Sequence, residues 1–421
     1  MKDIWTERYL DAKNLVEGDF VEVLTGFNAN MDVKVDYSSL NLSMESVEPE
    51  NIDEPENLAE LKSVLKYCVK NGENREIPRN GLNLQIPRSK KTIGGQAGIW
   101  SNYLSQTRNS VTFYTPFLSQ KLADRVNESV LYPVMSGQFV LKNVRDSSNT
   151  DRMKENIIIE YSQEKTGRLI LSDSLKGFGP YFRGGVADHL EKMDQNLDRV
   201  LLSGFQNASG NIESKLKKSA EQMKSFETPI HLEYVDMGRE LSKLVNEHII
   251  PEVDSIGMDE TETAMIADIR GVEIEEGDVR LGEAFKLAKG LIREDNLQRV
   301  HIHTYKYHVV IADGDYPVDE EKIRQSMLYG EVSGITMADN GNLPRGETIR
   351  EFNMEDKHIE RLDELEHFED FFDLNGFVET GIACVDDLKV VAIPTIIHEN
   401  PDRLVGMGDI ISAGAFVGEL K

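Results

Sequence analysis

Short apolar runs that end in a polar turn alternate with amphipathic stretches along most of this chain, and this alternation constrains the fold more than any other feature. VEVLTGFNANMD (Val21–Asp32) and RVLLSGFQN (Arg199–Asn207) each have the form of a strand followed by a polar turn, and the helical NIESKLKKSAEQMKSF follows the second. Strands that alternate with helices predict a mostly parallel sheet flanked by helices. The sequence therefore predicts an α/β fold, in which ligands bind beyond the carboxyl ends of the strands.

Later segments continue this pattern. PIHLEYVDM predicts a strand and GRELSKLVNEHIIPEV its following helix, while VDSIGMDETE predicts a short strand that ends in acidic residues. RVHIHTYKYHVVIAD (Arg299–Asp313) predicts a long strand or a hairpin, and KVVAIPTIIHENP predicts one or two late strands. Because the carboxyl ends of parallel strands share one rim of the sheet, polar residues should gather there. These residues are Asn28, Asn30, Asp32, Gln206, Glu233, Asp236 and residues 259–262.

Two stretches depart from the pattern and predict a second, smaller unit. NGENREIPRNGLNLQIPRSKKT is rich in Gly, Pro and Asn, and NIIIEYSQEKTGRLILSDSLKGFGPYF predicts a hairpin. We expect a small, discontinuous β-rich domain formed by residues 25–91 and 141–185, and a large α/β domain formed by residues 1–24, 92–140 and 186–421. A small domain placed over the rim would act as a lid and exclude water from a reaction there.

Two strongly charged stretches need no functional explanation. ESVEPENIDEPENLAELKSVLKYC predicts a solvated loop that leads into a helix. EFNMEDKHIERLDELEHFEDFF predicts an exposed, charged helix.

The charge balance limits the partners of the chain. The formal net charge is −27, whereas nucleic-acid binding needs a basic face and attraction to an anionic membrane needs basic clusters. The two cysteines match neither a disulfide framework nor a zinc motif, and we find no signal peptide and no apolar run of about 20 residues. We therefore expect a soluble, cytoplasmic protein, either a monomer or a small homo-oligomer, that binds neither nucleic acid nor a membrane.

Two glycine-rich turns, each before a predicted helix, are the strongest candidates for chemistry. TIGGQAGIWSNYL places Gly94 and Gly95 where backbone N–H groups approach a ligand closely. In VGMGDIISAGAFVGEL, the turn before Asp409 forms a nest for an anion such as a transferring phosphoryl group, and the carboxylate can accept the proton of an attacking hydroxyl. Each turn taken alone also fits a packed connection or, for Asp409, an ordinary helix N-cap.

The two turns occur with other motifs in a characteristic order over the whole chain. The order is GFNANMD, TIGGQAGIWSN, HLEYVDM, SIGMDETE, VHIHTYKYHVVI and VGMGDIIS. It resembles the ribokinase-like sugar kinases, and more closely the archaeal ADP-dependent glucokinase and phosphofructokinase family. The resemblance implies a large domain that carries ADP, a small β-rich lid that closes over the sugar, ADP as phosphoryl donor with AMP as product, and a requirement for Mg²⁺.

The resemblance also implies roles for individual residues. Asp409 matches the catalytic base, and Gly406 and Gly408 belong to the turn that stabilises the transferring phosphoryl group. The other matching residues are Asn30 and Asp32, which hold sugar hydroxyls; Gly94, Gly95 and Gln96, which line the same pocket; and Glu233, Glu262 and Asp259, from the acidic motifs around the metal. Asp259 stands where the family commonly has Asn, which adds negative charge near the phosphates. His231 is better explained as a half-buried strand residue than as a metal ligand.

The family divides between glucose and fructose 6-phosphate as acceptors. A sugar phosphate needs cations on the lid side, and the candidates are Lys165 and Arg168, followed by Arg183, Arg88, Lys90 and Lys91. Glucose users commonly carry a His where Asn156 stands, which favours fructose 6-phosphate here. They also place a Glu near the EIP segment, for which Glu73 and Glu76 both qualify. The resemblance therefore implies an ADP-dependent 6-phosphofructokinase in a modified glycolysis, with glucose as a second acceptor.

Three alternatives remain open from the sequence. In the first, the main activity is that of an ADP-dependent glucokinase. In the second, the phosphoryl donor is ATP, as in other ribokinase-type sugar kinases. The third alternative is a sugar- or nucleotide-binding regulator with a decayed site, against which the intact Asp409 and its glycines argue.

Overall fold

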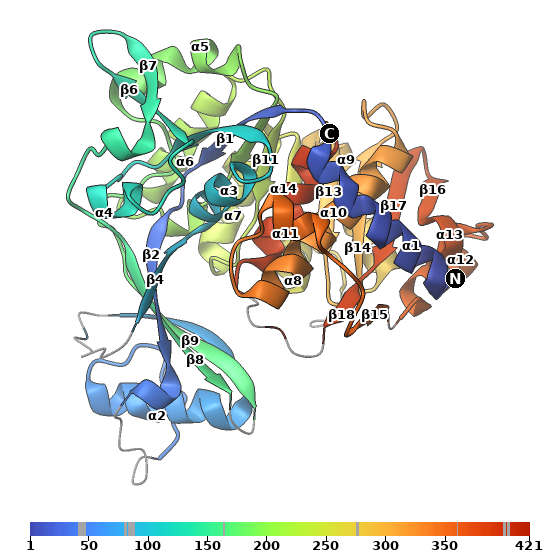
Figure 1. Ribbon diagram of the computed structural model, residues 1–421, viewed down its shortest axis with the longest axis horizontal. Coiled ribbons are helices and arrows are strands. Elements are labelled where there is room, and N and C mark those ends of the chain that lie inside the picture. Colours follow the sequence, from blue (N-terminus) through green and yellow to red (C-terminus); the bar gives the residue numbers. More distant parts are fainter. Residues whose placement is uncertain are drawn as a thin grey trace.

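The computed structural model describes residues 1–40, 48–79, 82, 89–162, 165–274, 278–359, 361–398, 401 and 405–421 (Figure 1). Within these ranges, the larger of the sheets has eleven strands in the order β16-β17-β14-β13-β12-β11-β10-β1-β5-β6-β7. The strands are β1 (Val21–Gly26), β5 (Asn109–Tyr114), β6 (Leu131–Met135), β7 (Phe139–Asn143), β10 (Arg199–Leu202), β11 (Ile230–Glu233), β12 (Ser255–Met258), β13 (Arg299–His303), β14 (Tyr307–Asp313), β16 (Ile382–Val385) and β17 (Leu388–Pro394).

The middle of this sheet is parallel and buried, as the continuous apolar runs predict. β5, β1, β10, β11, β12 and β13 pair in parallel, and every residue of β10, β11 and β12 is buried. Parallel strands covered by helices on both faces have this composition. The stretch 299–313 forms an antiparallel hairpin of β13 and β14, which confirms the second of the two forms predicted for it.

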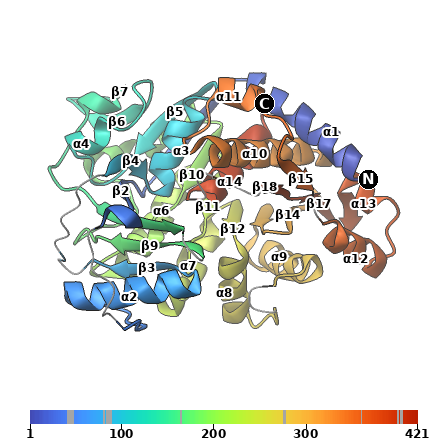
Figure 2. The same cartoon turned by 60° about the horizontal axis from the view of Figure 1, so that its bottom comes forward.

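Helices cover both faces of the sheet. Figure 2 shows α1, α10, α11 and α14 above it and α7, α8 and α9 below it. The helices are α1 (Lys2–Ala12), α2 (Leu58–Asn71), α3 (Gln96–Leu104), α4 (Gln120–Ala123), α5 (Leu190–Asp194), α6 (Ile212–Met223), α7 (Arg239–His248), α8 (Glu260–Arg270), α9 (Leu281–Asp295), α10 (Glu320–Asn340), α11 (Gly346–Arg350), α12 (Asp363–Phe371), α13 (Phe377–Thr380) and α14 (Met407–Gly418). The described helices include none that combines the length and hydropathy that a membrane crossing requires.

α10 and α14 approach each other unusually closely because glycines face each other. A Cβ atom built on Gly330 would lie 2.5 Å from the carbonyl oxygen of Ile411, and one built on Gly414 would lie 2.9 Å from the Cα of Gly330. Larger side chains at these positions would push the helices apart, because a close-packed interior has no free space and overpacking it costs free energy. The small residues of the C-terminal motif thus fix α14 against α10.

A second sheet of five strands lies apart from the first and has its own core (Figure 1). Its order is β3 (Asn74–Pro78), β9 (Thr166–Ser172), β8 (Glu155–Ser162), β2 (Asn30–Asp36) and β4 (Lys90–Gly94). The predicted hairpin is confirmed as β8 and β9, which pair antiparallel. The exact division into domains stays a prediction; residues 141–143, expected in the small domain, belong to β7 of the large sheet.

The small sheet has one covered and one open face, because side chains alternate along each strand. Leu61 and Leu65 of α2 pack against Ile157, Ile159 and Leu169 on the covered face. Residues in register on the other face are Asp32 with Asn156, Lys34 with Ile158, Ile158 with Ile170, Glu160 with Arg168, and Glu76 with Ile170. The open face therefore carries polar and charged residues from four strands.

The predicted exposed helix over residues 351–372 is wrong in its form and its burial. Residues 357–359 form β15 (Lys357–Ile359), which pairs with β18 (Ile396–His398), and only Asp363–Phe371 are helical. In α12, Leu365 and Phe368 are buried, and the Phe368 ring meets that of Phe285 at 5.8 Å. The prediction rested on the many charged residues and missed the few apolar ones on one side of α12, which pack on α9.

The buried Glu331 of α10 gives a test of how this core responds to pH. Its Oε1 accepts a hydrogen bond from Ile396 N–H at 3.0 Å, while its Oε2 lies 3.5 Å from His308 Nε2. Burial raises the pKa of Glu331 from 4.5 to about 7, and the hydrogen bond from Ile396 and the charge of His303 only partly oppose this. The folded protein therefore holds this proton more tightly than the unfolded chain does, so stability falls as the pH rises from about 4.5 to about 7.

Glu331→Gln keeps an oxygen acceptor for Ile396 N–H and carries no charge. We expect its free energy of unfolding to exceed that of the wild type by up to about 3 kcal/mol at about pH 8, and to equal it below about pH 4.5. Urea unfolding across this range measures the difference. Glu366→Gln, on the exposed side of α12, should leave the pH profile unchanged; a parallel shift of both variants would contradict the assignment to Glu331.

Candidate active site

The turn that precedes α14 opens a row of backbone donors. Gly406 is the N-cap, with a left-handed φ of 83°, and Asp409 is the third residue of the helix. The N-cap role considered for Asp409 is therefore wrong. The first bond within the helix runs from Ile410 N–H to the Gly406 carbonyl at 3.2 Å. The N–H groups of residues 407–409 thus lack acceptors inside the helix and suit an anion.

Two contacts hold this turn in place. The Trp100 indole N–H of α3 donates to the backbone carbonyl of Asp409 at 2.9 Å. Gly408 lies against His303, where an added Cβ would come within 3.0 Å of the ring. The half-buried Asp409 is thereby tied to both α3 and β13. Its glycines serve two purposes: Gly406 adopts a conformation that side chains disfavour, and Gly408 makes room for an imidazole.

The residues predicted to hold the sugar lie together where β2 and β4 enter the small sheet. Asn30 and Asp32 are buried, and Asn30 Nδ2 donates to Asp32 Oδ1 at 2.5 Å. Asn30 pairs with Gly94, and a Cβ built on Gly94 would lie 2.1 Å from an Asp32 carboxylate oxygen. Gly94 is therefore glycine because the Asp32 carboxylate occupies the space beside it.

The start of α3 adjoins this group. Gly95 is its N-cap with φ 74°, and a Cβ there would lie 2.7 Å from the Asn28 carbonyl oxygen. Asn28 Nδ2 donates to Gln96 Oε1 at 2.8 Å. The structure thus brings together Asn30, Asp32, Gly94, Gly95 and Gln96, the predicted sugar-binding set.

Glu233, predicted as a metal ligand, is enclosed by protein donors. At the end of β11 its Oε2 lies 3.2 Å from His231 Nε2 and accepts from Ser412 Oγ at 2.5 Å, and its Oε1 lies 3.2 Å from His303 Nε2. A Cβ on Gly257 of the next strand would fall 2.4 Å from this carboxylate, so the network needs that glycine. His231 is fully buried rather than half-buried.

The charges of this network favour an ion pair between Glu233 and His303. Burial alone raises the pKa of Glu233, but the hydrogen bonds from His231 and His303 outweigh it and lower the pKa to about 2. Burial lowers the pKa of His303, yet the hydrogen bond and charge of Glu233, with the charge of Asp259, raise it to about 9. Glu233 is therefore ionised and pairs with the cationic His303 of β13. Its hydrogen bond from Ser412, one turn after Asp409, also joins β11 to α14.

Asp259 and Glu262 form the capping box of α8. Asp259 Oδ1 accepts from Glu262 N–H at 2.9 Å, and Glu262 Oε2 accepts from Asp259 N–H at 2.8 Å. The family's usual Asn would cap equally well, so the cap tolerates the Asp found here. Burial raises the pKa of Glu262 well above 4.5, and the charges of Asp259, Glu233 and Asp409 raise it further.

The acidic residues fit a hard divalent cation through water better than by direct coordination. The described part of the chain holds no group of three or more His, Cys, Asp or Glu side chains arranged to bind a metal on their own. Glu233, Asp259 and Glu262 are already bonded within the protein. Mg²⁺ keeps several waters and takes one or two carboxylates plus phosphates. Burial raises the pKa of Glu262 most, and the repulsion from neighbouring carboxylates, which raises it further, is what such a cation would relieve.

The two predicted lid cations occupy different surroundings. Arg168 lies on the open face of the small sheet, in register with Glu160. Burial lowers its pKa, and the charges of Tyr305, Glu160 and Asp409 act against this, so Asp409 lies within electrostatic range of the guanidinium. Lys165 is exposed, and its ammonium donates to the Asn71 carbonyl at the end of α2, at 3.1 Å. The structure thus brings Arg168 to the site and leaves Lys165 outside it.

The further cation candidates have other partners. Lys90 Nζ donates to Asn342 Oδ1 at 3.2 Å, and Lys91 Nζ lies 3.4 Å from Glu155. The Arg183 guanidinium stacks over the Phe117 ring at 4.5 Å. Arg88 lies outside the described residues.

Sequence reasoning missed Lys154, whose backbone carbonyl accepts from Met31 N–H between Asn30 and Asp32 of the predicted sugar-binding set. It is buried, and its ammonium donates to Asn207 Oδ1 at 2.7 Å. Burial lowers the pKa of Lys154, against the charges of Glu76, Asp32 and Asp173. A lysine two residues before the apolar run NIIIEY was the available signal, because an ammonium at the start of a buried strand needs acidic neighbours.

The structure also separates the two glutamates near EIP. Glu76 lies on the open face, close enough to Arg168 to act on its charge, whereas Glu73 precedes β3. Asn156 lies on the same face, and its Oδ1 accepts from Asp173 N–H at 3.3 Å. Glu76, cited in favour of glucose, and Asn156, cited in favour of fructose 6-phosphate, therefore lie on the same face of the small sheet.

Comparison with known proteins extends over nearly the whole chain. The profile of the ADP-specific Phosphofructokinase/Glucokinase conserved region matches residues 21–418. The chain is 25% identical to the ADP-specific phosphofructokinase of Pyrococcus horikoshii, covering 96% of this chain and 98% of that protein. It is 24% identical to the ADP-dependent glucose/glucosamine kinase of Pyrococcus furiosus, covering 99% of each.

A solved structure confirms the predicted α/β fold. It is that of an ADP-dependent kinase in complex with fructose-6-phosphate and ADPβS, with a TM-score of 0.81 and 24% sequence identity, covering 100% of this chain and 97% of the other. The family profile spans both sheets, the turn before α3 and the turn before α14. This chain belongs to the ADP-specific phosphofructokinase/glucokinase family.

Proposed function

We propose that this protein transfers the β-phosphoryl group of ADP to fructose 6-phosphate, giving fructose 1,6-bisphosphate and AMP. The observation that carries the proposal is the position of Arg168 on the open face of the small sheet, in register with Glu160 and within electrostatic range of Asp409. A cation within electrostatic range of the proposed base suits an acceptor that carries its own phosphate. The relative from Pyrococcus horikoshii, named for phosphofructokinase activity, supports the same choice.

In the proposed reaction, the acceptor hydroxyl oxygen forms a bond to the β-phosphorus of ADP while the bond from that phosphorus to the α-β bridging oxygen breaks. Asp409 takes the hydroxyl proton, and AMP leaves with the bridging oxygen. The N–H groups of residues 407–409 stabilise the charge on the transferring group. Asn30 and Asp32 hold sugar hydroxyls, with Gly94, Gly95 and Gln96 beside them.

Mg²⁺ is the proposed cofactor. Asp259, Glu262 and Glu233 would hold it, largely through water, and it would offset the negative charge of the phosphates. The small sheet, with α2 behind it, is the proposed lid, and its open face would exclude water from the transfer.

A glucokinase activity is the second candidate. Glu76 on the open face favours it, and so does the full-length similarity to the glucose/glucosamine kinase of Pyrococcus furiosus. Assays of ADP and ATP against fructose 6-phosphate and glucose distinguish the candidates. We expect AMP release with ADP and fructose 6-phosphate to be fastest. Activity with ATP alone would refute ADP dependence, faster turnover of glucose would favour a glucokinase, and no turnover with any pair would favour a binding regulator.

Asp409→Asn removes the proposed base with little change in shape. We expect turnover to fall by ~10²–10⁴-fold, the usual contribution of a general base, while the affinity for ADP measured by calorimetry stays within a few-fold. Asp236→Asn is the matched control, because Asp236 is an exposed carboxylate at the same rim. A near-normal turnover of Asp409→Asn would show that another group takes the proton.

Arg168→Ala tests the acceptor phosphate. Loss of a charge-assisted hydrogen bond should raise the KM for fructose 6-phosphate by ~10–100-fold and leave the KM for glucose nearly unchanged. Lys165→Ala removes the same charge from the same hairpin, outside the site, and should alter neither KM. Equal effects of the two variants, or an equal rise in both KM values for Arg168→Ala, would contradict the assigned role.

A further inference from the structure

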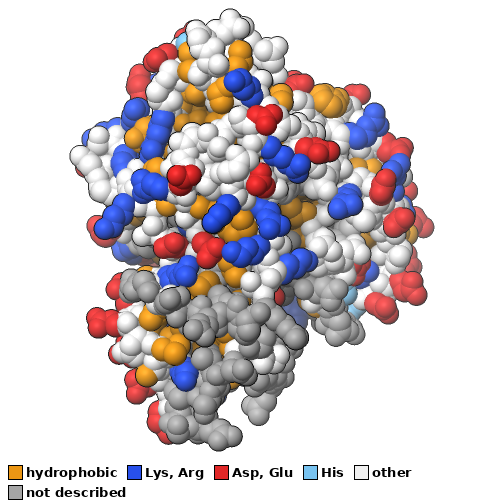
Figure 3. Space-filling view, turned by 60° about the vertical axis from the view of Figure 1, so that its left-hand side comes forward, with side chains coloured by type: hydrophobic (Ala, Val, Ile, Leu, Met, Phe, Trp, Pro, Cys, Tyr) orange, Lys and Arg blue, Asp and Glu red, His pale blue; other side chains and the backbone are white. Residues whose placement is uncertain are grey.

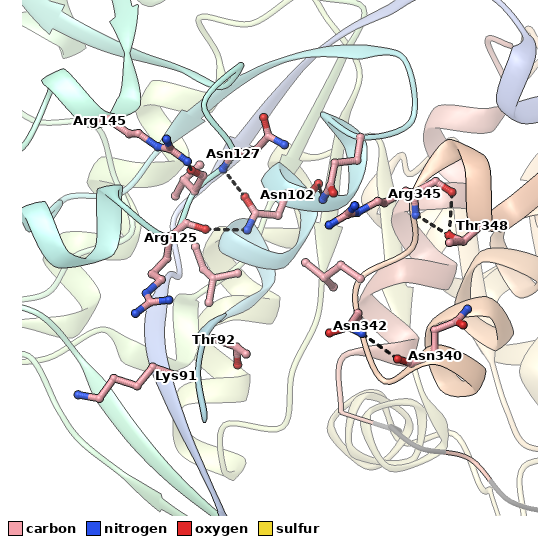
Figure 4. Close-up of a pocket in the computed structure, with 14 residues that line it drawn as sticks. Lys91, Thr92, Asn102, Arg125, Asn127, Arg145, Asn340, Asn342, Arg345 and Thr348 are labelled. Atoms are coloured by element: carbon pink, nitrogen blue, oxygen red, sulfur yellow. Dashed lines mark hydrogen bonds between the residues drawn. The ribbon is translucent and has the colours of Figure 1, made fainter. Parts of the chain in front are cut away.

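A cavity of about 680 Å³ lies beside α3, which contributes Asn102 to its lining (Figure 4). Four cations line it: Lys91 of β4, Arg125 and Arg145 from the turns after α4 and β7, and Arg345 before α11. The remaining lining residues are amides, hydroxyls and apolar residues, without a carboxylate. Figure 3 shows this side of the molecule, with Lys and Arg side chains gathered across its middle.

Of these four cations, two are already close to carboxylates and two are available to a ligand. Arg145 lies 3.4 Å from Glu128, and Lys91 lies 3.4 Å from Glu155. Among the described residues, the side chains of Arg125 and Arg345 have neither a carboxylate partner nor a hydrogen bond. In a chain of net charge −27, carboxylates are plentiful. Two guanidinium groups without carboxylate partners therefore concentrate positive charge in one cavity, whereas the chain as a whole is strongly negative.

The wall between them is well ordered by hydrogen bonds. Asn102 Nδ2 of α3 donates to the Arg125 carbonyl at 2.9 Å, and Asn102 Oδ1 accepts from Asn127 N–H at 2.7 Å. On the opposite side, the Thr348 hydroxyl accepts from Arg345 N–H at 2.9 Å. Figure 4 shows Arg125 and Arg345 on either side of Asn102, with the Arg345 side chain pointing toward Asn102 and the Arg125 guanidinium pointing toward the side of Lys91. The backbone that carries each arginine is thus fixed before a ligand arrives.

We propose that this cavity is a second anion-binding site, which takes a compact small molecule with two or more phosphate groups. Arginine forms paired hydrogen bonds with phosphate oxygens, and cations on opposite walls match charges at both ends of such a molecule. The volume lies within the range of small-molecule sites. The overall acidity of the chain excludes a long polyanion, which would extend beyond the cavity over acidic surface.

The position of the site suggests how its occupant acts on the rest of the protein. Thr92 and Ile93 of β4 form part of the lining, directly before Gly94 and Gly95. Thr92 is in register with Asp32 of β2. A ligand in this cavity therefore touches the strand that leads into the predicted sugar pocket.

Calorimetric titration with inorganic tripolyphosphate tests the site, with saturating AMP present to occupy the proposed nucleotide site. We expect saturable 1:1 binding to the wild type that weakens at least 10-fold in Arg125→Ser/Arg345→Ser. Lys224→Ser/Arg293→Ser removes equal charge from distant, exposed positions and should bind as the wild type does. Absence of binding, unchanged affinity of the cavity variant, or equal weakening of both variants would overturn the proposal.

Two further arms complete the test. The single variant Arg345→Gln, on a surface turn, should weaken binding several-fold and replaces the double variant if that one does not fold. Fructose 1,6-bisphosphate should compete with tripolyphosphate, whereas a single-stranded oligonucleotide should not; tighter binding of the oligonucleotide would overturn the small-molecule assignment. Because the comparison measures binding at Arg125 and Arg345, it holds whether or not the proposed phosphoryl transfer is correct.

Discussion

The contact between α10 and α14 fixes the part of the molecule on which the proposed chemistry depends. Glycines at the contact let the two helices meet backbone to backbone, and Trp100 and His303 then hold the first turn of α14 from two further sides. Asp409 is therefore placed by three separate elements, α3, α10 and β13. A helix held this firmly can present N–H groups that have no acceptor within the helix without fraying, which an anion site at a helix start requires.

The buried hydrogen-bond network around Glu233 also holds α14 in place, from the side of the sheet. A buried carboxylate is costly unless it is hydrogen-bonded and paired with a cation, and Glu233 obtains both from His231, Ser412 and His303. Its bond to Ser412 lies one turn beyond Asp409, so the carboxylate aligns α14 with β11. Its structural bonds also explain why an acidic strand end, read from the sequence as a metal ligand, need not touch a metal directly.

Much of the fold could be predicted from the sequence, because the alternation of apolar and amphipathic segments is local information. The two hairpins at 156–172 and 299–313 and the glycine turns before α3 and α14 follow from spacing and composition. The segment 351–372 could not, since its charges outnumber the few residues that pack on α9. Lys165 and Arg168 differ by three positions in one hairpin, and only strand pairing reveals that one faces α2 and the other the proposed site.

The strands β2 and β4 connect the two sheets as a hydrogen-bonded ribbon rather than as separate tethers. They pair antiparallel from Asn30 with Gly94 to Lys34 with Lys90, and β8 runs alongside from Met31 onward. A ribbon bends easily out of its plane but resists shear within it, because shear would break every cross-strand bond at once. A bend of this ribbon out of its plane therefore leaves the pairing of Asn30 with Gly94 and of Asp32 with Thr92 intact.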